Sequence, residues 1–211
     1  MMNLEDTLYQ VGVLPVIRLE TAESAVPLAK ALRNGGLPAA EITFRSDAAA
    51  EAIRRISREV PEVYVCAGTV LDPETAALAH EAGARAIITP GIHSGTMDWC
   101  EKHEVPVVSG CATPSEVEVC MRRGMKLVKF FPAEVMGGVA MLKALAGPYP
   151  HMKFMPTGGV KPANLADYLR QTNVAACGGT WIVPPELLKE EKYDEIEALA
   201  RAAAALRDVV R

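Results

Sequence analysis

The run KLVKFFP, residues 126–132, is short, apolar and bounded by a proline, which is typical of a strand buried on both faces. A helical pattern follows it at residues 138–146, and a second strand-like run follows that helix at residues 153–155. A strand, a helix and a second strand in this order predict parallel pairing through a crossover helix. The segment therefore indicates an α/β protein.

The same alternation extends along the chain in both directions. Strand-like runs occupy residues 13–17, 39–44, 63–67, 86–89, 105–108, 127–131, 153–155 and 174–177. Helical patterns occupy residues 22–34, 48–59, 73–82, 94–102, 114–123, 138–146 and 162–170. Prolines and glycines mark many of the boundaries, as expected for short connections between such units.

These eight units predict one small (β/α)8 barrel, or TIM barrel, that forms a single domain over residues 1–211. We expect an extra N-terminal helix at residues 4–10 and a helical end at residues 186–211. No linker or low-complexity stretch divides the chain. An open doubly wound sheet is the alternative. The barrel is favoured because candidate reactive residues follow many strands, as at a barrel's C-terminal face.

Composition narrows the class of partner. Half of the 211 residues are hydrophobic, which is sufficient for a core, and the formal net charge is −4. Acidic and basic residues are scattered without a basic stripe, so we do not expect nucleic acid as a partner. Residues 1–6 include acids and no long apolar run, and no later segment is apolar over a membrane-spanning length. We therefore expect a protein without a secretory signal or a membrane segment.

Cysteine and histidine usage predicts a cytoplasmic protein without a metal centre. The five cysteines are odd in number and widely spaced, which predicts reduced, buried thiols: Cys66, Cys100, Cys111, Cys120 and Cys177. The chain has no CxxC or HExxH motif, and its four histidines are not clustered. We expect neither a metal nor an organic cofactor.

Lys129 is the main candidate for a catalytic residue. It lies inside the apolar run, where burial disfavours the charged ammonium and favours an amine that can attack a carbonyl. A lysine at a strand end can instead pack its stem and extend its amine to water, and the run alone does not separate the two interpretations. Lys126 begins the strand and faces its opposite side, so it is the weaker candidate nucleophile.

The strand at residues 39–44 carries a polar face. Strand alternation places Glu41, Thr43 and Arg45 on one face and Ile42 and Phe44 on the other. If the apolar pair packs against helices, the polar face can supply a carboxylate for proton transfer and a guanidinium for a substrate carboxylate. A structural ion pair explains the spacing equally well.

Three further strand ends carry candidate ligand-binding residues. Thr69 follows a strand and can either bind a ligand or cap the next turn. Gly-Gly pairs occur at residues 158–159 and 178–179, after the last two strands. Such turns let backbone N–H groups approach a phosphate near a helix N-terminus, and barrels commonly bind phosphate at this position.

Taken together, these segments resemble the KDPG/KHG aldolase family, which acts on 2-keto-3-deoxy-6-phosphogluconate (KDPG) and 4-hydroxy-2-oxoglutarate (KHG). The resemblance covers nearly all 211 residues. It rests on EITFR (41–45), GTVL (68–71), TPG (89–91), KFFPAE (129–134), PTGG (156–159) and GGTW (178–181).

The resemblance implies a homotrimeric class I aldolase of the Entner–Doudoroff pathway that needs no cofactor. It would cleave KDPG to pyruvate and glyceraldehyde 3-phosphate, and KHG to pyruvate and glyoxylate. Lys129 would form the Schiff base, and Glu41 would be the general acid and base, acting partly through water. Arg45 and Thr69 would hold the pyruvyl carboxylate. The implied pocket residues are Pro90 and Thr157, and the implied phosphate ligands are Gly158, Gly159, Gly179 and Thr180.

Several features leave alternatives open. Residues 92–94 and 110–113 are closer to 2-keto-3-deoxy-6-phosphogalactonate aldolases, whereas residues 43–46 and 130–134 fit the gluconate branch. A non-catalytic phosphosugar-binding barrel would use the glycine turns alone. Arg18 can bind phosphate or form a surface ion pair. Trp99 and Trp181 are interpreted as packing or interface residues.

Overall fold

The protein is described by a computed structural model that covers residues 4–210. Its strands are β1 (Val13–Ile17), β2 (Ala39–Thr43), β3 (Tyr64–Gly68), β4 (Ala86–Ile88), β5 (Val107–Val108), β6 (Gly110–Cys111), β7 (Leu127–Phe130), β8 (Lys153–Pro156) and β9 (Cys177–Gly179). Its helices are α1 (Leu4–Val11), α2 (Ala25–Asn34), α3 (Ala49–Glu59), α4 (Pro73–Glu81), α5 (Ser94–Lys102), α6 (Pro114–Arg122), α7 (Gly138–Ala146), α8 (Pro162–Leu169), α9 (Pro185–Lys189) and α10 (Tyr193–Val210).

The strands form two parallel sheets. One has six strands in the order β5-β4-β3-β2-β1-β9, and the other has three in the order β6-β7-β8. In the first sheet, Glu41 of β2 pairs with Val16 of β1 and Cys66 of β3. In the second, Lys129 of β7 pairs with Met155 of β8. The two candidate catalytic residues therefore lie in different sheets.

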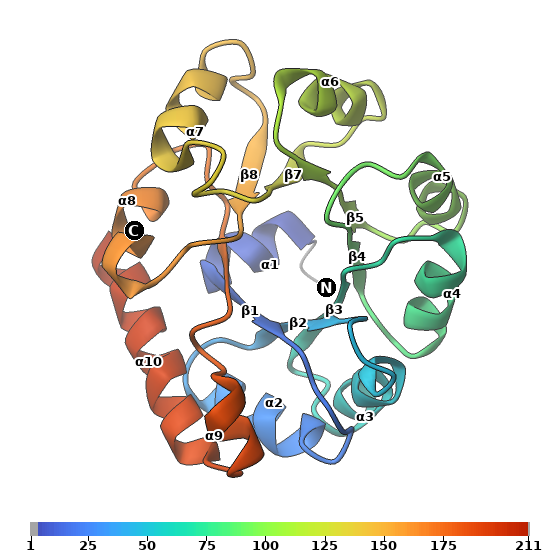
Figure 1. Cartoon of the computed structure of the whole chain (residues 1–211), viewed down its shortest axis with the longest axis vertical. Coiled ribbons are helices and arrows are strands. Elements are labelled where there is room, and N and C mark those ends of the chain that lie inside the picture. Colours follow the sequence, from blue (N-terminus) through green and yellow to red (C-terminus); the bar gives the residue numbers. More distant parts are fainter. Residues whose placement is uncertain (1–3, 211) are drawn as a thin grey trace.

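The two sheets adjoin along both edges. Only Ser109 separates β5 from β6, and its carbonyl accepts a backbone hydrogen bond of 2.9 Å from β7. On the other side, isolated parallel bridges join Phe154 to Val174 and Thr157 to Gly178. The strands surround a common centre, and helices α2 to α8 lie outside them (Figure 1). The fold is thus a curled, parallel α/β arrangement.

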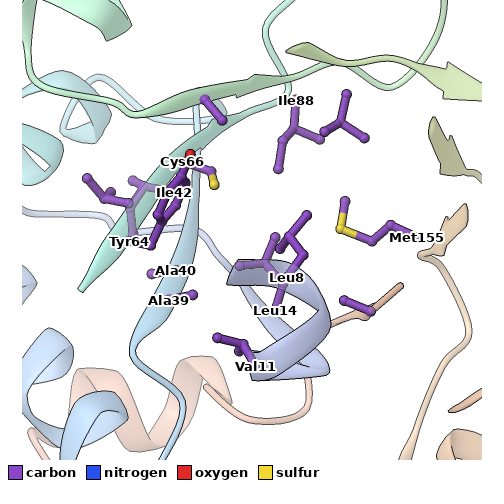
Figure 2. Packing of buried hydrophobic residues seen from close by; sticks show 14 of the residues in the cluster. Leu8, Val11, Leu14, Ala39, Ala40, Ile42, Tyr64, Cys66, Ile88 and Met155 are labelled. Carbon is purple, nitrogen blue, oxygen red and sulfur yellow. The ribbon is translucent and has the colours of Figure 1, made fainter. Parts of the chain in front are cut away.

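Helix α1 lies over the centre of the ring of strands (Figure 1). Its residues Leu8 and Val11 are buried, and Figure 2 shows them beside Leu14 of β1, with Met155 of β8 across the core. The helix ends two residues before β1 begins, so it lies at the N-terminal ends of the strands. Apolar side chains therefore fill this end of the interior.

Many predicted boundaries are confirmed, among them the helices at residues 94–102 and 138–146 and the strand at residues 13–17. The last strand was predicted wrongly at residues 174–177. It spans Cys177–Gly179 because Gly178 and Gly179 pair with Leu14 and Pro15 of β1.

Two other predictions also need correction. The strand expected at residues 105–108 is shorter, and a separate short strand, β6, follows it after Ser109. The helical end expected at residues 186–211 consists of two helices, because the chain turns at residues 190–192, where Glu191 has a φ of 54°. Arg211 lies outside the described residues.

Other expectations concern burial and packing. All five cysteines are buried, as predicted. Trp99 stacks on His103 with ring centroids 4.2 Å apart, and Trp181 packs against the core, so both act in packing. Within residues 4–210, no helix is long and apolar enough to cross a membrane. The same residues contain no group of three or more His, Cys, Asp or Glu side chains placed to hold a metal ion.

Candidate active site

Glu41 and Lys129 meet in the interior of the protein. Lys129 Nζ lies 3.2 Å from Glu41 Oε1, and the two side chains are 6% and 0% exposed. Because β2 and β7 belong to different sheets, this contact crosses the space that the strands enclose. The neighbours Val128 and Phe130 are also buried and alternate with the lysine along β7. Lys129 therefore projects inward, which favours the buried interpretation of this lysine over the one in which its amine extends to water.

The carboxylate of Glu41 is only partly satisfied by the protein. Oε1 contacts the lysine amine, whereas Oε2 is buried and has no hydrogen-bond partner among the described residues. Gly68 of β3 packs so closely that a Cβ there would overlap the Glu41 side chain. Burial and the nearby Glu41 raise the pKa of the Cys66 thiol, which keeps this neighbour uncharged. An unsatisfied buried acceptor is costly and is typical of functional sites.

Lys126 has a different environment on the same segment. It precedes β7 and is exposed, whereas Lys129 is 5% exposed and its amine lies 5.4 Å from the centroid of the Phe131 ring. The prediction that Lys126 is the weaker candidate agrees with this placement.

Thr43 connects Arg45 to the neighbouring strand. Its hydroxyl donates 2.8 Å to the carbonyl of Ile17 and accepts 3.1 Å from Arg45 Nε. Thr43 is buried, and Arg45 is exposed just beyond the end of β2. The arginine thus lies at the C-terminal end of the strand that carries Glu41, with one guanidinium N–H held by the threonine. Sequence reasoning placed Thr43 on this face but gave it no role.

Thr69 and Pro90 follow β3 and β4. Thr69 is half-buried and has a φ of 57°, a left-handed conformation that costs a non-glycine residue about 1–3 kcal/mol and is frequent at functional sites. Pro90 is half-buried, and its carbonyl leaves no room for a Cβ on Gly110. Since Gly110 pairs with Lys129, Pro90 lies near the lysine strand.

Thr157 and the first glycine pair form a turn at the end of β8. Thr157 is buried and donates a backbone hydrogen bond of 2.9 Å to Phe130 of β7. Gly158 and Gly159 have φ values of 96° and 81°, which glycine adopts without strain. Helix α8 begins at Pro162, so the turn leads into a helix N-terminus suited to an anion.

The second glycine pair differs from the expected turn. Gly178 and Gly179 are buried in strand β9, and Thr180 is exposed just after it. A Cβ on Gly178 would overlap Thr157, and one on Gly179 would overlap the Trp181 ring. These glycines therefore permit close packing between strands, and only the first pair forms a left-handed turn.

Two further charged residues, Arg18 and Glu134, follow β1 and β7. Arg18 forms an exposed ion pair with Glu20, 3.2 Å from Nε to Oε1, which matches the surface alternative for this arginine. Glu134, in the loop after β7, accepts a hydrogen bond from the Tyr168 hydroxyl, and its backbone N–H donates 3.1 Å to Gly158. Glu134 was part of the family motif, but sequence reasoning assigned it no function, because its partner lies 34 residues away.

Fold and site together define a class: a curled parallel α/β protein in which a buried lysine amine contacts a buried carboxylate. Polar residues from several strand ends follow this pair on the C-terminal side, which is where parallel α/β barrels place their reactive groups.

Comparison with known proteins narrows this class to a family. The protein-family model described as KDPG and KHG aldolase matches residues 4–199 of this chain. The chain therefore belongs to the KDPG and KHG aldolase family. It is 46% identical to the KHG/KDPG aldolase of Escherichia coli (strain K12), over 90% of both chains.

Two examples among the solved structures with this fold are KDPG aldolases. A Legionella pneumophila KDPG aldolase with pyruvate captured as a covalent carbinolamine has a TM-score of 0.92 and 37% identity, covering 96% of this chain and 98% of that one. A Zymomonas mobilis ZM4 2-keto-3-deoxy-6-phosphogluconate aldolase with 3-phosphoglycerate has a TM-score of 0.90 and 34% identity, covering 98% and 97%.

Proposed function

We propose that this protein is a class I aldolase that cleaves KDPG to pyruvate and glyceraldehyde 3-phosphate. The observation that carries the proposal is the buried contact of 3.2 Å between Lys129 Nζ and Glu41 Oε1. The Legionella pneumophila relative was captured with pyruvate as a covalent carbinolamine, which is the first adduct of an amine with a ketone. A barrel that only bound phosphosugars would have no use for a buried amine beside a carboxylate.

Lys129 would begin the reaction as a nucleophile. Its neutral amine attacks the C2 ketone of KDPG, and proton transfer to the oxygen gives a carbinolamine. Return of a proton from Glu41 to the hydroxyl and loss of water then give a protonated imine, which is an electron sink. The electrons of the C3–C4 bond flow into this imine and leave an enamine. At the same time the C4 hydroxyl loses its proton, and glyceraldehyde 3-phosphate departs.

Glu41 is placed to move these protons. One oxygen lies beside the amine, so it can take a proton from Lys129 before attack, and the other oxygen has no partner among the described residues. Directly or through water, the carboxylate would accept the C4 hydroxyl proton and later return a proton to C3 of the enamine. Water then hydrolyses the imine, which releases pyruvate and the free lysine.

The substrate carboxylate would bind at the ends of β2 and β3. Arg45 offers a planar guanidinium that suits bidentate recognition, and Thr43 already holds its Nε. Thr69 would add a hydroxyl from the next strand end, and Pro90 would line the pocket. These groups orient C2 toward Lys129, and such positioning is a large part of the expected rate enhancement.

The phosphate would bind at the opposite rim. The left-handed Gly158–Gly159 turn and the N-terminus of α8 offer backbone N–H groups, with Thr157 beside them contacting the substrate. Gly179 and Thr180 would complete the site from the end of β9. The Zymomonas mobilis ZM4 relative binds 3-phosphoglycerate, a phosphate ester of similar size to the product.

We also propose the finer features of the fold and assembly. The two sheets together would form one closed (β/α)8 barrel and a single domain, which is supported by the bridges between β8 and the β9 region and by the one-residue gap at Ser109. The family resemblance supports a cytoplasmic homotrimer, and light scattering of the purified protein would test that assembly.

Borohydride trapping tests the proposed chemistry. Reduction in the presence of pyruvate should add a stable adduct to one peptide, and mass spectrometry should map it to Lys129. The variant Lys126→Ala is the matched control and should trap pyruvate like the unmodified protein. An adduct on Lys126, or no adduct at all, would contradict the proposal.

A second substrate is supported by one comparison. The Escherichia coli relative is named a KHG/KDPG aldolase, so we propose that this protein also cleaves KHG to pyruvate and glyoxylate. The phosphogalactonate epimer is the remaining alternative. Comparing kcat/KM for the three substrates decides the order of preference, and a higher value for the galactonate epimer would reassign the main substrate.

A further inference from the structure

The loop after β7 packs on the turn after β8. The backbone N–H of Ala133 donates 2.8 Å to Thr157, and that of Glu134 donates 3.1 Å to Gly158. These two bonds link the loop to the turn beyond the ends of the paired strands. The loop that follows Lys129 is therefore attached to the turn that we propose as the phosphate site.

The side chain of Glu134 lies against the same turn. A Cβ on Gly159 would overlap Cβ and Cγ of Glu134, which shows that the glutamate stem packs on the bare glycine. Its Oε1 accepts a hydrogen bond from the hydroxyl of Tyr168. Tyr168 is fully buried on α8, the helix that begins just after the turn. The glutamate thus spans from the β7 loop across Gly159 to α8.

We propose that Glu134 and Tyr168 are positioning residues that hold the Gly158–Gly159 turn in its phosphate-binding conformation and so set the affinity for phosphorylated substrates. Two consecutive left-handed glycines have many accessible conformations, so ordering them for a ligand costs entropy. Contacts that order the turn in advance reduce this cost. The inference deepens the proposed function and depends on it for the identity of the substrate.

The ionisation of the pair agrees with a structural link. Burial and the neighbouring Glu134 carboxylate both raise the pKa of Tyr168, so the phenol stays protonated and can donate. A carboxylate beside a phosphate is by itself repulsive, so Glu134 would not act as a phosphate ligand. Its contribution would be to hold the backbone of the Gly158–Gly159 turn in place. The charge of Glu134 and its hydrogen bond with Tyr168 would therefore have opposite effects on phosphate binding.

Three variants separate these effects. Glu134→Ala removes the packing stem and the acceptor, Tyr168→Phe removes only the donor, and Glu134→Gln keeps an acceptor without the charge. We expect Glu134→Ala to raise KM for KDPG about tenfold, as for loss of a hydrogen bond to a charged group, with Tyr168→Phe intermediate and kcat little changed. We expect Glu134→Gln to stay within about twofold of the unmodified protein. Asp167→Asn, on the same helix but paired with Arg170, is the matched control.

KHG provides the discriminating substrate because it lacks a phosphate. The proposal expects kcat/KM for KHG to stay within about twofold in all four variants, since the Gly158–Gly159 backbone would contact only the phosphate. An equal loss for KDPG and KHG in Glu134→Ala would indicate general damage to the site and would overturn the proposal. Unchanged KM for KDPG in that variant would overturn it as well.

Binding of 3-phosphoglycerate tests the turn without turnover. Calorimetry should show about tenfold weaker binding to Glu134→Ala and near-normal binding to Glu134→Gln. Tighter binding to Glu134→Ala would show that the carboxylate only repels the ligand, which would overturn the proposal. If the unmodified protein failed to trap pyruvate, the proposed function would fail, while this binding measurement would still decide the role of Glu134.

Discussion

The two ends of the strands have opposite characters. At the N-terminal end, Leu8 and Val11 of α1 pack beside Leu14 near the start of β1, and all three side chains are buried and apolar. Toward the C-terminal end, the enclosed space contains the Glu41–Lys129 pair, and polar residues follow the strands. The difference indicates that one end supplies stability and the other supplies chemistry.

This division also appears within a single strand segment. Lys126, just before β7, is exposed to solvent, and Lys129, near the end of the strand, contacts a buried carboxylate. The two lysines therefore have different properties because of their positions along the segment and the direction of their side chains. Substitutions at the C-terminal end should therefore change catalysis, and substitutions at the N-terminal end should change the free energy of unfolding.

The largest effect is expected at Lys129. Lys129→Gln removes the nucleophile while keeping an N–H that can donate to Glu41, so kcat/KM should fall at least about 10⁴-fold and the fold should persist. Steady-state kinetics and circular dichroism check both parts. Residual activity above one-hundredth of the unmodified protein would show that another amine forms the imine.

Glu41→Gln should produce the next largest effect. The amide keeps the shape of the side chain but is not a base, so cleavage should slow by about 10²–10⁴-fold. Pyruvate should still be trapped by borohydride, because the imine forms on Lys129. Rapid cleavage with normal kcat would remove Glu41 from the proton-transfer role and weaken the contrast between the two ends.

Leu8→Ala tests the apolar end. The buried leucine should leave a cavity, and the free energy of unfolding should fall by about 2–5 kcal/mol in a denaturant titration. The kcat of the folded variant should be unchanged. Gln10→Ala, at an exposed position on the same helix, is the control and should cost about 0.5 kcal/mol or less. A large drop in kcat for Leu8→Ala would contradict the assignment of stability to the N-terminal end and of chemistry to the C-terminal end.

The smallest predicted effect concerns the N-cap of α4. Asp72 accepts 2.7 Å from the backbone N–H of Thr75, and the hydrogen bonds from Thr75 lower the pKa of Asp72. Asp72→Ala should cost about 1 kcal/mol of stability at neutral pH. Because the folded-state pKa is depressed, this stabilisation is present above the unfolded pKa of about 3.9 and is lost as the pH falls through the folded value.

Unfolding measured at neutral and at acidic pH checks the sign. The difference between Asp72→Ala and the unmodified protein should shrink below about pH 4. Asp72→Asn keeps a capping oxygen and should lose less stability at neutral pH. A difference that grew on acidification would contradict the assigned cause.

Local patterns predicted much of the fold. The apolar run around Lys129 indicated a buried strand, and β7 is found at Leu127–Phe130. Helix α5 and helix α7 have the predicted bounds, because their starts and stops depend on nearby residues. Alternation also placed Glu41 and Thr43 on one strand face, and their side chains do reach the interior contacts described above.

Predictions failed where distant residues decide the structure. The Gly178-Gly179 pair resembled a turn, yet it forms strand β9 because β1 pairs with it and the Thr157 and Trp181 side chains occupy the space beside it. The link between Glu134 and Tyr168 likewise joins residues from different units. No local pattern reports which side chain will fill the space next to a glycine.

By itself, the sequence determined the alternation of strands and helices, the apolar setting of Lys129 and membership of an aldolase family, because these depend on short-range periodicity and on motifs. Only the tertiary structure decided that Lys129 meets Glu41, 88 residues away, and that Glu134 lies on Gly159. Such contacts require the strands to curl around a common interior. Their distances are therefore a property of the packed sheets and not of any one segment.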